Sequence, residues 1–136
     1  MTPETIAALE ASFAAIGDRR TELTPLFYDR LFARAPGVRG LFPDDISHQA
    51  MKLADTLEVV IAHLRSLDSV APALMEMGDR HARYGAKPEH YPIVGDTLLA
   101  SLAEVSGDAW NHKVEEAWRE AIEVISATML SGVRSR

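Results

Sequence analysis

A single histidine lies at the end of an apolar helix face in the middle of the chain. His81 follows Val70, Leu74 and Met77 at spacings of 4, 3 and 4 residues, which places the four side chains on one stripe of a helix. A neutral imidazole ligates a transition metal through one ring nitrogen. A histidine in this position is also, and more commonly, a packed core residue, so the pattern alone leaves both interpretations open.

Three further residues occupy comparable positions. Gln49 opens the apolar face of a helix expected over residues 47–64, Tyr28 lies beside an apolar face, and Phe42 lies in a loop. Taken singly, they indicate a polar helix end, a hydrogen-bonded buried tyrosine and a plug that closes the core. Taken with His81, they fit an apolar slot for a planar cofactor, with an axial imidazole for iron on one side and hydroxyl and amide donors on the other.

The elements that position these residues are helices, because apolar residues recur at helical spacing and no segment alternates convincingly as a strand does. Thr2, Ser47 and Asn111 are expected N-caps, and Gly17 and Pro36 end helices. The expected helices cover residues 3–16, 21–35, 47–64, 69–82, 89–105 and 112–133, with a short turn over 36–42. The pattern predicts an all-α fold with short connections and argues against a doubly wound α/β fold.

Composition limits the classes of function. The chain has 136 residues, which fits one domain over residues 1–136, and its 47% apolar and 25% charged residues are globular values. The net charge of −6 argues against a nucleic-acid partner. A run of about 18 apolar residues, which a membrane span needs, is missing. The first residues also lack an apolar signal core, so we expect no membrane association and a cytoplasmic location.

Missing residue types and motifs exclude further classes. The chain has no cysteine, so disulfides, thiolate zinc sites, iron–sulfur clusters and cysteine-linked cofactors are ruled out. Glycine-rich nucleotide-binding motifs and the GxSxG motif of hydrolases are absent too. Any cofactor is therefore expected to be held non-covalently or through His, Asp, Glu, Met or Tyr.

Four stretches of the chain resemble the globin family. They are LFYDRLFARAPGVRGLF (26–42), HQAMKL (48–53), RHARYGAKPEHYPIVGDTLL (80–99) and EEAWREAIEVI (115–125). The combination RHxxYG with HYPIVG is the most specific, and it is similar to single-domain bacterial haemoglobins and to the globin domain of flavohaemoglobins. The resemblance implies a globin fold of six to eight helices around haem b, the non-covalently bound iron protoporphyrin IX.

The resemblance assigns roles to the residues singled out above. His81 matches the proximal histidine that ligates the haem iron, and Phe42 matches the phenylalanine that stacks on the porphyrin. Tyr28 matches the tyrosine that reaches over the iron on the ligand side. Gln49 matches the glutamine that takes the place of the distal histidine in this group, and Leu53 matches the apolar residue that covers the iron.

The distal position requires a choice between His48 and Gln49. Gln49 shares a helix face with Leu53 and Leu57, whereas His48 lies about 100° away around the helix. The register of the family also favours Gln49, and we therefore assign the distal position to this residue.

Other residues match the family's cofactor contacts less specifically. Tyr91 matches a tyrosine near the proximal histidine, and Arg80 and Lys52 fall where cationic side chains meet haem propionates. Met77 and Val94 are further expected contacts of the cofactor.

The chain departs from the flavohaemoglobin pattern in two respects. Val133 stands where a glutamate of the family joins the tyrosine that matches Tyr91 in polarising the proximal histidine, which weakens any peroxidase-like interpretation. The chain ends at Arg136, so a flavin or nicotinamide domain is not expected, and a catalytic cycle would need an external flavin reductase.

The implied function is reversible binding of O2, with NO and CO as further ligands, for oxygen binding, storage or delivery. NO dioxygenation with an external reductase is a related activity, so whether the protein is an enzyme stays open. The alternatives are a haem-based gas sensor, for which no output domain is seen, and a haem-free helical interaction module.

Overall fold

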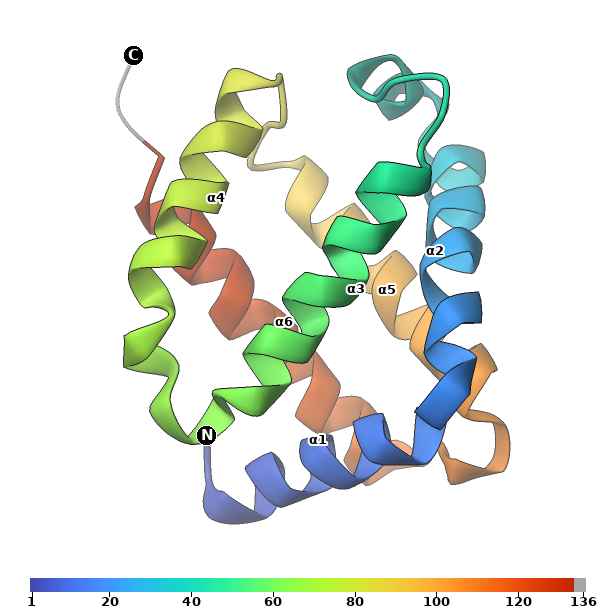
Figure 1. Cartoon of the computed structure of the whole chain (residues 1–136), viewed down its shortest axis with the longest axis vertical. Coiled ribbons are helices and arrows are strands. Elements are labelled where there is room, and N and C mark those ends of the chain that lie inside the picture. Colours follow the sequence, from blue (N-terminus) through green and yellow to red (C-terminus); the bar gives the residue numbers. More distant parts are fainter. Residues whose placement is uncertain (134–136) are drawn as a thin grey trace.

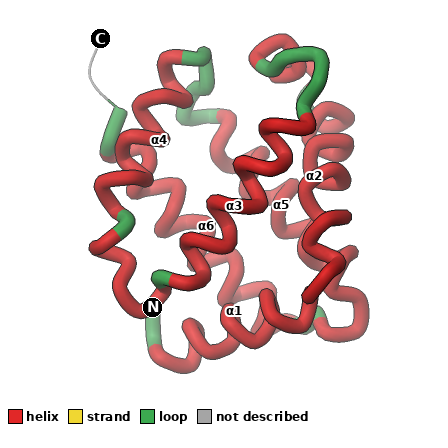
Figure 2. The backbone as a smooth tube through the Cα atoms, in the orientation of Figure 1, coloured by secondary structure: helices red, strands yellow, loops and turns green. Residues whose placement is uncertain are grey.

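The computed structural model describes residues 1–133, and this range contains α-helices and short 3-10 helices but no strand. The α-helices are α1 (Pro3–Ile16), α2 (Arg20–Arg34), α3 (Ser47–Ala62), α4 (Ala71–Arg83), α5 (His90–Ser106) and α6 (His112–Ser131). The 3-10 helices cover Gly17–Arg19, Pro36–Leu41, Leu64–Ser69 and Gly107–Ala109, and the remaining connections are short (Figure 2). The predicted all-α class is confirmed.

Two of the expected N-caps begin their helices as predicted. The Thr2 hydroxyl accepts a hydrogen bond from the Thr5 amide at 3.1 Å. The Asn111 side chain accepts one from the Val114 amide at 2.9 Å. Each bond satisfies an amide that the helix leaves without a partner, and these two helices therefore start at the predicted residues.

The third expected cap is wrong. Ser47 is the first residue inside α3 and does not cap it. The Asp45 carboxylate instead accepts a hydrogen bond from the Ser47 amide at 3.0 Å, and its hydrogen bonds with Ser47 lower the pKa of Asp45. A carboxylate near a helix N-terminus is favoured by the helix dipole, which explains why the aspartate takes this position.

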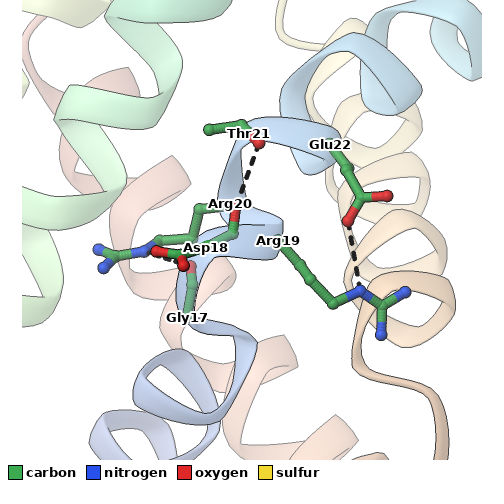
Figure 3. Close-up of polar contacts among 6 residues, drawn as sticks. All are labelled: Gly17, Asp18, Arg19, Arg20, Thr21 and Glu22. Carbon is green, nitrogen blue, oxygen red and sulfur yellow. Dashed lines mark hydrogen bonds and ion pairs between the residues drawn. The ribbon is translucent and has the colours of Figure 1, made fainter.

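The corner between α1 and α2 is fixed by short-range hydrogen bonds (Figure 3). Gly17 has a positive φ of 55°, which reverses the chain after α1. Arg20 Nε then donates to the Gly17 carbonyl at 3.0 Å, and the Thr21 hydroxyl donates to the Asp18 carbonyl at 3.1 Å. These bonds start α2, the helix that carries Tyr28.

Buried apolar residues from every α-helix form the core. The largest fully buried side chain is Trp118 of α6, and its Nε1 donates to the Ser12 hydroxyl of α1 at 3.0 Å. This bond satisfies two polar groups that would be costly to bury alone. It ties the first helix to the last. Leu9 and Phe13 of the first helix also belong to the core.

Helices α3 and α4 are consecutive in the chain but do not pack closely against each other. Helix α3 packs on α2, while α4 packs on α6, and α2 packs on α5. The two helices meet at their connection, Leu64–Ser69, and diverge away from it, with α5 and α6 behind them (Figure 1). None of the helices in residues 1–133 combines the length and apolarity that crossing a bilayer demands.

Candidate functional site

The side chain of His81 lies near the C-terminal end of α4 and is held in one orientation by its own helix. Its Nδ1 lies 2.7 Å from the backbone carbonyl oxygen of Met77. A carbonyl oxygen only accepts hydrogen bonds, so Nδ1 carries a proton, and in the neutral form of such a ring the lone pair lies on Nε2. The ring is exposed. A hydrogen bond of this kind is what orients metal-ligating histidines in proteins.

The metal-ligating side chains of the described residues suit a metal ion that a cofactor already coordinates. Within residues 1–133, no cluster of three or more His, Asp or Glu side chains could hold a bare metal ion. His81 could therefore supply one axial ligand to a metal already coordinated by a macrocycle, such as iron in a porphyrin. The residues present fit that cofactor.

Tyr28, on α2, supplies the second polar group of the predicted site. The ring is 7% exposed and contacts Phe27, Phe32 and Phe42, with centroid distances of 5.0, 5.9 and 5.7 Å. Burial raises the pKa of Tyr28 to about 12, so the phenol is neutral and able to donate at pH 7. No hydrogen bond engages its hydroxyl group within the part of the chain that the structure describes.

Arg39 holds the loop that carries Phe42. Its Nη1 donates to the Pro43 carbonyl at 2.9 Å and to the Phe42 carbonyl at 3.4 Å, and its Nη2 donates to the Asp44 carbonyl at 2.9 Å. The guanidinium also lies 4.8 Å from the centroid of the Phe32 ring. Sequence reasoning missed this residue, because a lone arginine in a turn carries no pattern that reveals which carbonyls it binds.

On α3, each of the two predicted distal residues is less exposed than the residue directly before it. Gln49 and Leu53 are half-buried, and Leu53 packs against the core. His48 and Lys52 are exposed. This placement agrees with the choice of Gln49 over His48, while the roles of all four residues remain predictions.

Residues from α4 and α5 supply the other side of the predicted site. Met77 is half-buried and packs against the core, whereas Arg80 is exposed. Tyr91 is half-buried, and burial raises its pKa. Val94 is 37% exposed, and its contact with a cofactor stays a prediction.

The structure brings Val133 and Tyr91 together, although 42 residues separate them in the chain. Both line a cavity of about 410 Å³ between the α4–α5 connection and the end of α6. The other described lining residues are Ala82, Ala86, Pro88 and Leu130. No acidic side chain is among these lining residues, so none of them offers Tyr91 a carboxylate.

The structure thus places an oriented imidazole on α4 and a buried phenol on α2 of an all-α fold. The sequence profile of the globin family matches residues 26–129. The chain therefore belongs to the globin family, as its sequence resemblance predicts, and membership of this family implies haem binding.

Curated relatives are consistent with this assignment. The chain is 33% identical over 129 residues to a flavohemoprotein of Halalkalibacterium halodurans, covering 93% of this chain and 31% of that protein. It is 31% identical to a flavohemoprotein of Bacillus subtilis, covering 90% and 32%. It thus spans about a third of the length of these flavohemoproteins. It is also 28% identical to an uncharacterized globin-like protein of Aquifex aeolicus, covering 96% and 93%.

Solved structures confirm the predicted globin fold. An engineered carbene transferase from Rhodothermus marinus superposes with a TM-score of 0.87 at 26% identity, covering 96% of this chain and 92% of that one. A bacterial globin from Campylobacter jejuni gives a TM-score of 0.84 at 23% identity, covering 96% and 95%. The second likeness concerns the fold alone.

Replacing Arg39 is expected to loosen the loop around Phe42. In Arg39→Ala, three carbonyls lose a charged donor, and hydrogen exchange at the hydrogen-bonded amides of Phe42 and Ser47 should accelerate about 5- to 30-fold, the equivalent of about 1–2 kcal/mol. The matched control is Arg19→Ala, which removes an exposed arginine paired with Glu22 and should leave this loop unchanged. Equal exchange in both variants would show that Arg39 does not hold the loop.

Proposed function

We propose that this globin binds haem b non-covalently, with His81 Nε2 as the axial ligand of iron, and that it binds O2 reversibly. The observation that carries the proposal is the hydrogen bond from His81 Nδ1 to the Met77 carbonyl, which leaves Nε2 free. When bound, the haem would supply an iron able to bind a diatomic gas, and His81 would hold that iron. NO and CO are proposed as further ligands of the same site.

Tyr28 and Gln49 are proposed to act on the gas ligand. A diatomic ligand held at the site would carry partial negative charge, and a hydroxyl or amide donor beside it would stabilise that charge. With a pKa near 12, the Tyr28 phenol stays protonated throughout the neutral range, so its donation should not change between about pH 6 and pH 9. The Gln49 amide supplies a second, neutral donor.

The apolar and cationic residues of the site have separate proposed roles. Phe42, Leu53 and Met77 pack partly against the core, and their apolar surfaces would exclude water from the iron. Lys52 and Arg80 are exposed, which leaves their charges available to the carboxylates of a porphyrin at the rim of the site.

Removing His81 should abolish most haem retention. In His81→Ala the axial bond is lost, so the purified protein should show a weak Soret band that added imidazole partly restores. His48→Ala and His63→Ala are matched controls and should keep the wild-type spectrum. His63 is the sharper control, because its Nδ1 lies 2.7 Å from the Val59 carbonyl in the same arrangement as at His81. A wild-type ferrous spectrum in His81→Ala without imidazole would overturn the axial assignment, and no Soret band in the wild type after haem addition would favour a haem-free interaction module.

Removing the phenol hydroxyl should speed the release of O2. A hydrogen bond to a partly charged group contributes roughly 1.5–3 kcal/mol, which corresponds to about 10- to 150-fold in the O2 dissociation rate of Tyr28→Phe. CO carries less charge, so its dissociation rate serves as the internal control. Gln49→Leu should act in the same direction more weakly, and the double variant tests redundancy. Unchanged O2 dissociation in all three variants, measured by stopped flow, would contradict the proposed donors.

The similarity to flavohemoproteins favours NO dioxygenation as a second candidate activity. The net reaction combines one NO, one O2 and one electron to give nitrate, so turnover needs a continuous supply of electrons. We propose that a separate flavin reductase supplies them to this chain. A gas sensor would require only binding.

An NO electrode distinguishes these cases. Haem-loaded protein with O2 and NADH should consume NO for a single turnover, and steady consumption should begin only when a flavin reductase is added. Sustained consumption before the addition would contradict dependence on a reductase. No consumption after the addition of several reductases would favour oxygen binding alone.

A further inference from the structure

Helices α4 and α6 touch each other through the backbones of two glycines. A Cβ built on Gly78 of α4 would stand 1.9 Å from the carbonyl oxygen of Met129 in α6. A Cβ built on Gly132, directly after α6, would stand 2.1 Å from the carbonyl oxygen of Met75 in α4. Real Cβ atoms do not approach other atoms so closely, and these neighbours are backbone atoms that cannot rotate away. The contact is reciprocal, because each helix offers one glycine to a carbonyl of the other.

Glycine is required at Gly78 and Gly132 because the backbone of the other helix lies too close to leave room for a Cβ atom. The backbone conformation at these positions does not require it. Positive φ angles occur at Gly17, Gly85 and Gly107 among the described glycines, and neither Gly78 nor Gly132 is in this group. Glycine is a poor helix former, so its presence inside α4 at Gly78 needs a packing reason. The glycine hydrogen that takes the place of Cβ points at the carbonyl oxygen, which is the geometry of a Cα–H···O contact.

The contact lies in the turn of α4 that orients the imidazole. Gly78 directly follows Met77, whose carbonyl accepts the hydrogen bond from His81 Nδ1. His81 is three residues further along the same helix, and the buried Asp79 in between forms an ion pair with Arg83. The backbone that fixes the imidazole is therefore the backbone that rests directly on α6.

We propose that Gly78 and Gly132 are positioning residues for His81: their backbone contact sets the distance between α4 and α6 and thereby the position of His81 Nε2. This proposal rests on the proposed haem ligation by His81. An added methyl group would force the helices apart by about 1 Å, and a displacement of that size is enough to degrade an active-site geometry about 100-fold.

The decisive variant is Gly132→Ala, because the substitution lies beyond the last turn of α6 and leaves the His81 helix unchanged in sequence. Haem loss from the loaded protein to excess apomyoglobin should be about 10- to 100-fold faster than in wild type, the usual effect of disturbing the support of a metal ligand. The iron–His81 stretching band in the resonance Raman spectrum of the reduced protein should shift as well. Gly78→Ala should do the same from the other side of the contact.

Two glycines provide matched controls. A Cβ on Gly40 meets nothing within 4 Å, so Gly40→Ala should leave haem loss and the Raman band unchanged. A Cβ on Gly95 meets the movable Ile122 side chain at 3.1 Å, so Gly95→Ala adds a methyl group to a helix contact remote from the α4–α6 crossing. It should change the Raman band less than Gly132→Ala does.

A second set of variants, built on His81→Gly, distinguishes positioning of the imidazole from general damage to the fold. In His81→Gly rescued with imidazole, the ligand is not attached to α4, so adding Gly132→Ala should leave the iron–imidazole band and the imidazole affinity unchanged. A shift that persists in this background overturns the proposal. Wild-type haem loss and an unshifted band in Gly132→Ala overturn it too, as does failure of both glycine variants to fold by circular dichroism.

The experiments give different results if the proposed haem ligation by His81 is wrong. If wild-type protein binds haem but His81→Ala keeps the same spectrum, ligation by His81 is wrong, and the positioning proposal falls with it. If His81→Ala loses haem and Gly132→Ala does not, only the positioning proposal is wrong.

Discussion

The hydrogen bond between His81 Nδ1 and the Met77 carbonyl is the interaction on which the site depends, because it decides which ring nitrogen carries the proton. At 2.7 Å it holds the exposed imidazole in one orientation, as metal-ligating histidines are held. The acceptor belongs to the same helix as the donor, so the orientation of the ring follows the position of α4. A movement of this helix relative to α6 therefore moves the imidazole, the proposed ligand.

The opposite side of the site depends on a different physical constraint, the burial of a phenol. Tyr28 lies among the aromatic rings of Phe27, Phe32 and Phe42, and burial raises its pKa to about 12. The site thus combines an electron-pair donor on α4 with a proton donor on α2. These two helices have different main partners, since α4 packs on α6 and α2 packs on α5.

Periodicity and caps were sufficient to predict the helices, whose ends agree with the structure to within two residues. These signals are local, as the cap at Thr2 shows. The cap at Ser47 was wrong because the helix already includes Ser47, whose own amide donates to the side chain of Asp45, two residues earlier. The loop contacts of Arg39 and the contact of Gly132 with α4 could not be predicted, since they depend on where backbone carbonyls lie in space. The family resemblance supplied the site residues, and periodicity alone would have left His81 as a core histidine.

The electronic character of the proposed iron site follows from what surrounds His81. Its Nδ1 donates to a neutral carbonyl, and a carboxylate acceptor would give the imidazole more anionic character and more electron donation to iron. Val133 and Tyr91 line a shared cavity whose described walls carry no carboxylate, so Tyr91 has no acidic partner there through which to polarise the ring. If His81 ligates iron as proposed, weak donation would disfavour cleavage of an O–O bond, and the neutral phenol of Tyr28 would favour retention of intact O2. In the proposed site, both features would therefore favour binding of the gas over peroxidase-like chemistry.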